Sequence, residues 1–258
     1  MPTIRYGDPL TIADQLDEAG VVCVENAVPA EWLAQARAGV VDHLLTHGEH
    51  DYCIPLPQGE HLSAADAFAN SPSVQSLLGE IVRARFPDSP EGLEFAESGL
   101  RIIAGPQSTG EAFYFHYDAS IVTMVVPIFM PDAERGNSGE FMGLFNKRPF
   151  RRLVVTNIVD KIIRQNRFYR RFLIGKLDRT DYLHRVDMEV GNVYLFWGYR
   201  SLHGNMPCEP GALRATLIVH LGRPHGSSQA LTAAVRFAQS LRTGGEKRAV
   251  KEATASVA

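Results

Sequence analysis

The chain has 258 residues, of which 45% are hydrophobic and 21% are charged, and its formal net charge is −3. This is the composition of an ordinary globular protein, long enough for one domain with a sizeable core, and the small charge points to no particular partner. No apolar run approaches the ~20 residues that a membrane helix needs, so we expect no membrane association.

Two features favour a cytoplasmic protein. Met1–Tyr6 leads into polar sequence rather than into the apolar segment of a signal peptide, so none is expected. The three cysteines, Cys23, Cys53 and Cys208, are an odd and scattered set. That usage indicates a reducing compartment and no disulfide framework.

The first part of the chain predicts helices around one short strand. Residues 9–20 read as a helix, with Thr11 as the expected cap and Gly20 as the stop. Val21–Val24 predicts a buried strand, and a second helix is expected from Pro29 to about Leu45. We interpret this part as scaffold that packs against a sheet.

Residues 47–72 are rich in loop-forming residues and contain three histidines, His47, His50 and His61. Their irregular spacing, without framing cysteines or paired carboxylates, favours a solvated loop over a second metal site. A further helix is predicted over residues 71–86.

The middle of the chain predicts strands. A strand series begins at Leu100–Ala104, the pattern is all strand from Phe113 to about Met130, and another strand is expected at 140–145. Short strands separated by glycine turns predict a double-sheet jelly roll. The expected fold class is therefore α+β but mainly β, a cupin-like double-stranded β-helix flanked by N-terminal helices.

We expect a single domain over residues 1–243, with the barrel core at about 98–225 and a disordered tail at 244–258. A basic insert, residues 147–185, interrupts the barrel. It holds twelve Lys or Arg and three Asp, a net charge of +9, which leaves −12 for the rest of the chain.

The basic insert contains a predicted helix over residues 158–173. Its charge is either a solvated face or a cover over the pocket mouth that attracts an anionic substrate, such as a phosphate-, CoA- or carrier-linked acyl group. Nucleic acid is less favoured, because no stacking platform or recognition motif accompanies the charge.

Five residues form the candidate site. His116 and Asp118 are two apart, so their side chains leave the same face of an extended strand. His203 would complete a set of two histidines and one carboxylate, which binds Fe(II) and leaves positions open for substrates and oxygen. Arg214 and Thr216 share one face of an otherwise apolar strand and together form a fork that can grip a carboxylate.

The order His-x-Asp, distant His and Arg-x-Thr resembles the Fe(II)/2-oxoglutarate-dependent dioxygenase superfamily. Residues 189–203 are similar to its glycine turn, apolar strand and second histidine, and residues 214–216 to its Arg-x-Ser oxoglutarate clamp. The pattern is closest to the phytanoyl-CoA-hydroxylase-like branch. The motifs span about residues 100–225, and an N-terminal match to the same branch extends to about residue 20.

The resemblance implies that His116, Asp118 and His203 are the catalytic metal ligands, and that Arg214 and Thr216 bind 2-oxoglutarate. The cofactors would be Fe(II), 2-oxoglutarate and O2, and the reaction a hydroxylation of an unactivated C–H bond with release of succinate and CO2. Halogenases of the superfamily lack this carboxylate, so hydroxylation is the default reading, with desaturation or ring closure still open. The expected substrate is a small molecule or a carrier- or CoA-linked group, and no pattern fixes the oligomeric state.

Other readings remain open. An oxoglutarate-independent cupin-like enzyme usually has three histidines, so Asp118 and Arg214 argue against it, and a non-catalytic ligand-binding barrel would tend to lose one of these groups. Cys208 follows His203 closely but is favoured as a bystander, because the donor set is already complete. His220 lies on the same strand face as Arg214, as a group behind the metal or facing the substrate. Thr123 and Arg101 match no motif residue of the superfamily.

Overall fold

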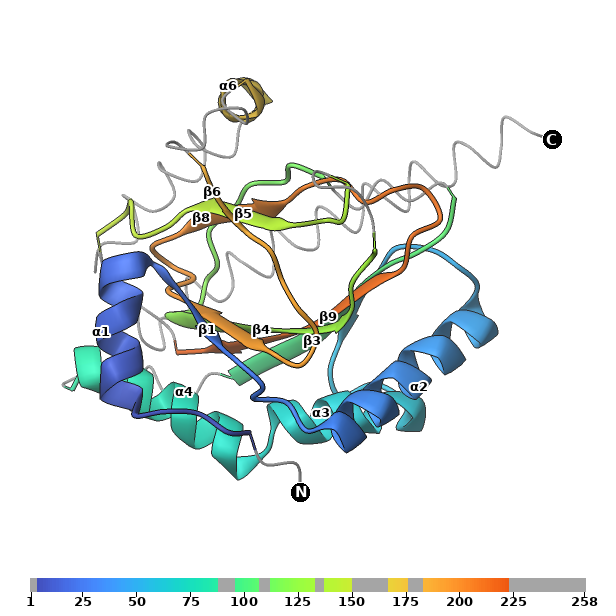
Figure 1. Ribbon diagram of the computed structural model, residues 1–258, viewed down its shortest axis with the longest axis horizontal. Coiled ribbons are helices and arrows are strands. Elements are labelled where there is room, and N and C mark those ends of the chain that lie inside the picture. The colour runs from blue at the N-terminus through green and yellow to red at the C-terminus, as the bar shows by residue number, and fades with distance from the viewer. Residues whose placement is uncertain are drawn as a thin grey trace, which may run out of the picture.

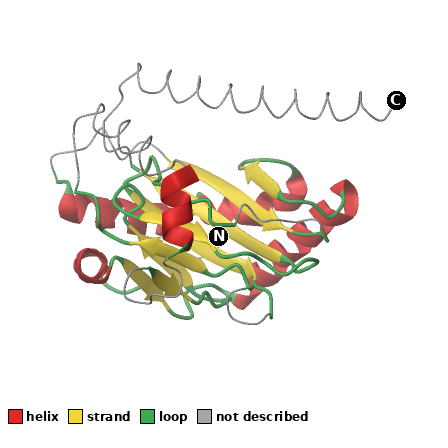
Figure 2. Ribbon diagram, turned by 90° about the horizontal axis from the view of Figure 1, so that it is seen from above, coloured by secondary structure: helices red, strands yellow, loops and turns green. Residues whose placement is uncertain are grey.

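The computed structural model describes residues 4–87, 96–106, 112–132, 137–149, 167–175 and 183–222. Two antiparallel sheets lie one above the other, and helices cover the side of the larger sheet that faces away from the smaller one (Figure 1). Seen from above, the strands run across the middle of the molecule, one helix crosses in front of them, and the other helices are seen beside and behind them (Figure 2). The helices are α1 (Pro9–Ala19), α2 (Ala30–His47), the 3-10 turn η1 (Glu60–Leu62), α3 (Ser63–Ala69), α4 (Pro72–Arg85) and α6 (Arg167–Ile174).

The larger sheet has the strand order β1-β7-β4-β9-β3-β2, and each neighbouring pair is antiparallel. In that order its strands are Val21–Val24, Val193–Phe196, Val122–Phe129, Arg214–Leu221, Ala96–Ile103 and Tyr52–Pro55. The smaller sheet has the order β6-β5-β8, made of His184–Val186, Phe141–Leu144 and Leu202–Asn205. Because neighbours in space are distant in sequence, the sheets bring together segments that the chain separates widely.

Strand β9 shows how the larger sheet divides the molecule. Alternate side chains of a strand point to opposite faces. One set on β9 packs into the hydrophobic cluster that also contains the apolar faces of α1, α2, α3 and α4, namely Ala215, Leu217, Val219 and Leu221. The other set faces away from these helices: Arg214, Thr216, Ile218 and His220. The polar residues of β9 therefore lie on the face that the smaller sheet overlies.

An aromatic cluster fills the space between the two sheets. Phe141 of β5 and Phe196 of β7 have ring centroids 5.0 Å apart, and both rings contact that of His203 on β8. Truncating a buried phenylalanine to alanine costs about 3–5 kcal/mol. These rings therefore hold the sheets together and form an apolar wall beside His203.

Helix α6 packs on the outer side of the smaller sheet. Its Leu173 is fully buried with Met142, Leu202 and Phe115, whereas its Phe172 is exposed. Of the predicted helix over 158–173, residues 158–166 lie outside the described residues, as does the predicted tail at 244–258. None of the described helices is long and apolar enough to span a membrane.

Three local predictions were wrong. The side chain that caps α1 is Asp8, which accepts from the backbone N–H of Thr11, although the stop at Gly20 is confirmed. The segment before β4 is not a strand, because β4 begins only at Val122 and Phe113 has φ +60°. The expected loop at 47–72 contains β2, η1 and α3, and its His61 ring stacks on His43.

Candidate metal centre

Two backbone hydrogen bonds join the distant halves of the site. His116 N–H donates to the His203 carbonyl and His203 N–H donates to the His116 carbonyl, each at 2.9 Å. This isolated antiparallel bridge places the two residues directly opposite each other, so their side chains emerge on the same side. The bridge closes the long gap in sequence without requiring a regular strand around His116.

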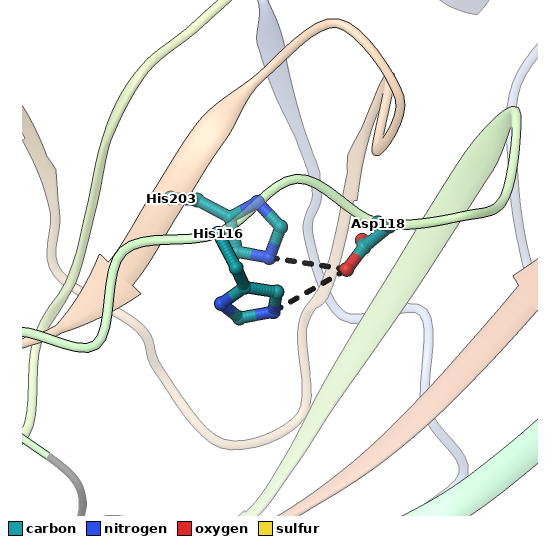
Figure 3. Close-up of side chains that lie close together, drawn as sticks. All are labelled: His116, Asp118 and His203. Carbon is teal, nitrogen blue, oxygen red and sulfur yellow. Dashed lines mark ion pairs between the residues drawn. The ribbon is translucent and has the colours of Figure 1, made fainter. Parts of the chain in front are cut away.

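Asp118 completes the cluster from the same irregular segment. Its backbone N–H donates to the Gly198 carbonyl at 3.1 Å, and its Oδ1 lies 3.4 Å from the Nε2 of both His116 and His203. Figure 3 shows both imidazoles turning Nε2 toward this oxygen. Asp118 and His203 are 8% and 6% exposed, whereas the side chain of His116 is 36% exposed. The site is thus buried on two sides and accessible past His116.

The remote nitrogen of each imidazole contacts a backbone carbonyl. His116 Nδ1 lies 3.1 Å from the Tyr114 oxygen, and His203 Nδ1 lies 3.0 Å from the Ser201 oxygen. A carbonyl can only accept, so in each neutral ring Nδ1 holds the proton and Nε2 presents its lone pair to the common point. This arrangement is typical of histidines that bind metals.

The three donors fit a divalent ion. One ligand atom from each of His116, Asp118 and His203 lies within 4.8 Å of the others, and no other described group of three such residues does so. Two adjacent ligands at ~2.1 Å from an ion are separated by about 3 Å, close to the observed 3.4 Å. Two histidines with one carboxylate and an open side suit Fe(II).

Asp118 is ionised without a metal. Burial raises the pKa of its carboxyl, but the imidazoles of His203, His220 and His116, when protonated, hold that pKa well below its usual value through their charge and hydrogen bonds. The carboxylate is therefore ready to bind a cation over the ordinary pH range.

Arg214 and Thr216 are both fully buried on the face of β9 that the smaller sheet overlies. Arg214 Nη2 donates to Asn205 Oδ1 at 3.2 Å, while its Nε has no hydrogen-bond partner among the described residues. Burial, reinforced by the charge of Arg101, lowers the pKa of Arg214 to about 10. A buried cation with a free donor fits an anion, as a carboxylate clamp requires.

The neighbours of the clamp include two residues that the sequence patterns left aside. Arg101 is the partner of Thr216 across the β3–β9 ladder, and its Nη1 donates to the Tyr52 carbonyl at 3.4 Å. Cys208 is buried beside Arg214, since a Cβ on Gly139 would lie 2.5 Å from Sγ and 2.7 Å from Arg214 Cδ. Burial raises the pKa of the Cys208 thiol, so it stays protonated beside the clamp and lies outside the metal cluster.

Two further residues contact the non-ligand side of Asp118. Thr123 Oγ1 donates to Asp118 Oδ2 at 2.6 Å, and His220 Nδ1 lies 3.8 Å from the same oxygen. The even spacing of His220 from Arg214 correctly predicts its strand face. Thr123 lies in an apolar run of the sequence. Its side chain reaches Asp118 because alternate side chains of β4 point to opposite faces of the larger sheet.

Comparison with known proteins identifies the fold. No protein-family model and no curated protein matches the sequence. A prolyl-4-hydroxylase from Pseudomonas putida matches with a TM-score of 0.52 and 15% identity, covering 86% of this chain and 97% of that one. A prolyl 4-hydroxylase from Phytophthora capsici gives 0.55 and 16%, covering 89% and 69%.

A third match is a prolyl hydroxylase from Trichoplax adhaerens, solved with a peptide fragment of hypoxia inducible factor. Its TM-score is 0.54 at 11% identity, and the match covers 83% of this chain and 90% of that one. The chain has the prolyl hydroxylase fold. At these identities the likeness establishes the fold alone, and none of the three proteins is a phytanoyl-CoA hydroxylase, so that branch stays a prediction.

Proposed function

We propose that the protein is a non-haem Fe(II)- and 2-oxoglutarate-dependent oxygenase. It would hydroxylate an unactivated C–H bond with release of succinate and CO2. The observation that supports this most directly is the convergence of His116, Asp118 and His203, with both Nε2 atoms 3.4 Å from one carboxylate oxygen, in a fold shared with prolyl hydroxylases. We also propose that the two sheets form the jelly roll that is expected from the sequence.

Each site residue then has a defined task. His116, Asp118 and His203 would hold Fe(II), which in this class of enzyme supplies the oxidation of a C–H bond by O2 and 2-oxoglutarate. Arg214 and Thr216 would hold the far carboxylate of 2-oxoglutarate. Phe141 and Phe196, packed against His203, exclude water from one side of the centre.

Arg214 favours this reading over a zinc hydrolase or an oxoglutarate-independent cupin enzyme. Zinc would bind two histidines and a carboxylate well, but its chemistry needs no buried cation with an unfilled donor. The same buried cation argues against a non-catalytic barrel, because an unused charge in this position lowers stability.

We propose an anionic substrate, either a small molecule or a carrier-linked group, and a cytoplasmic location for the protein. The +9 charge of residues 147–185 supports electrostatic attraction of an anion. If the basic insert steers the substrate, kcat/KM falls steeply with added salt. A kcat/KM that does not respond to salt contradicts the steering.

Conversion of labelled 2-oxoglutarate to succinate and CO2 tests the proposed function. We expect Fe(II)-dependent succinate formation by the wild type, with a panel of acyl, aminoacyl and prolyl substrates increasing the rate. His203→Ala abolishes it because one of three ligands is lost. Succinate formation that persists in His203→Ala, or its absence from iron-loaded protein with every substrate, contradicts the proposal.

A further inference from the structure

The two oxygens of the Asp118 carboxylate have different environments. Oδ1 faces the imidazoles of His116 and His203, whereas Oδ2 accepts a hydrogen bond of 2.6 Å from Thr123. Thr123 lies on β4 and is fully buried. Oδ1 is therefore the oxygen that faces the proposed metal position, whereas Oδ2 is turned toward Thr123.

The Thr123 hydroxyl is itself held in place. Its Oγ1 lies 3.0 Å from His220 Nδ1 and 3.1 Å from Ser120 Oγ, and Ser120 Oγ lies 3.0 Å from His220 Nδ1. An ionised carboxylate can only accept, so the single hydroxyl proton of Thr123 points to Asp118 and its lone pairs face the other two residues. The hydroxyl cannot turn away without breaking these contacts.

The backbone of Gly198 closes the remaining side. A Cβ at this position would lie 2.5 Å from Thr123 Oγ1 and 2.7 Å from Asp118 Oδ2, so the carboxylate rests directly against the glycine. Gly198 also accepts the backbone hydrogen bond of Asp118. The absence of a side chain at Gly198 thus leaves the room that the Asp118 carboxylate and the Thr123 hydroxyl occupy, and the hydrogen bond from Thr123 keeps Oδ2 turned away from the histidines.

We propose that Thr123, supported by His220 and Ser120, is a positioning residue that keeps Asp118 a one-oxygen ligand. This inference rests on the proposed function. Two histidines and one carboxylate oxygen leave three positions on a six-coordinate ion, two for 2-oxoglutarate and one for O2. A carboxylate that bound through both oxygens would occupy the position needed for O2.

Counting water on bound Mn(II) tests the proposal without turnover. Mn(II) replaces Fe(II) in the purified full-length protein, and its exchangeable waters are counted by magnetic resonance in H2O and D2O. We expect three waters on the wild type and two on Thr123→Val, which has nearly the same shape but no hydroxyl. Thr123→Ser keeps the hydroxyl and restores three.

Metal affinity gives a second readout. Loss of a group that orients a ligand typically weakens metal binding by about 10–100-fold, and we expect this for Thr123→Val but not for Thr123→Ser. Thr123→Ala provides the same test should the valine variant not fold, and its circular dichroism spectrum checks the fold.

The outcomes separate the two claims. Three waters on folded Thr123→Val or Thr123→Ala, equal to the wild type, overturn the positioning role while leaving the proposed function intact. A wild type that binds no Mn(II), or whose waters 2-oxoglutarate does not displace, overturns the proposed function and the positioning role with it.

Discussion

Arg214 and Asn205 are joined by a hydrogen bond of 3.2 Å from Nη2 to Oδ1, which links the larger sheet to the smaller one. Asn205 lies two residues after His203 on β8, so their side chains share a face of that strand. The proposed oxoglutarate clamp and a proposed metal ligand are therefore positioned by the same short strand. The spacing of His203 and Asn205 along β8 therefore sets the distance between the Arg214 guanidinium and the proposed metal centre.

Asn205→Asp tests this link. The new carboxylate would pair with the buried Arg214 and compete with 2-oxoglutarate for its guanidinium. We expect the affinity for 2-oxoglutarate, measured by titration calorimetry on the Mn(II) protein, to fall at least about tenfold, while the affinity for Mn(II) changes little. Asn205→Ala is the control, with a smaller loss, and an unchanged 2-oxoglutarate affinity in Asn205→Asp would contradict the link.

Arg214→Met separates function from stability. The substitution removes a buried cation whose pKa is lowered to about 10 mainly by burial, so the metal-free protein loses a desolvation cost along with its clamp. We expect 2-oxoglutarate binding to be lost while Tm stays equal or rises by a few degrees, as about 1 kcal/mol would give. A clear fall in Tm would mean that Arg214 is chiefly structural.

Asp118→Asn should lose metal binding and show a pH-dependent effect on stability. The folded-state pKa of Asp118 lies below the unfolded value of ~3.9, so the ionised group stabilises the metal-free fold above that pH. The stabilisation is lost as the pH falls through the lower, folded pKa. Chemical denaturation should show the variant less stable by about 1–3 kcal/mol at pH 7, with the difference shrinking below about pH 4. A difference that does not change with pH contradicts this origin.

Gly198→Ala should damage the centre through one methyl group. Its Cβ would lie 2.7 Å from Asp118 Oδ2 and 2.5 Å from Thr123 Oγ1, which forces the carboxylate to move. We expect Mn(II) affinity to fall by at least about 10–100-fold with the fold retained. Gly7→Ala is the matched control, because nothing lies within 4 Å of its added Cβ. Equal affinity in the two variants would show that the carboxylate can shift without consequence.

The sequence was most informative where chemistry and spacing coincide. Residue types and an even spacing on one strand single out Arg214 and His220, and the structure places both on the predicted face. His116 and His203 came together as predicted, although through one isolated bridge rather than a continuous strand. The segment from Phe113 to about Met130 is predicted as all strand, but it is irregular before Val122 and has a φ of +60° at Phe113.

Other features of the site and the fold could not be predicted from residue types or spacing. Asn205 lies two residues after the predicted ligand His203, but nothing in its neighbours indicates a hydrogen bond to a residue on the opposite sheet. Thr123 is one polar residue in an apolar run, and its role depends on Asp118 lying above it. The predicted cap of α1, Thr11, lies inside the helix, because Pro9 is the first helical residue and Asp8 precedes it. Long-range contacts of this kind arise only once the sheets are assembled.

Anaerobic titration of the metal-free protein with Fe(II) and then 2-oxoglutarate tests the central claim most directly. We predict a weak charge-transfer band in the green part of the spectrum when 2-oxoglutarate binds to the iron, and its loss in Arg214→Met at modest 2-oxoglutarate concentrations. Iron that binds without this band would favour an oxoglutarate-independent enzyme. A protein that binds no iron would contradict the account, since His116, Asp118 and His203 would then be a structural cluster.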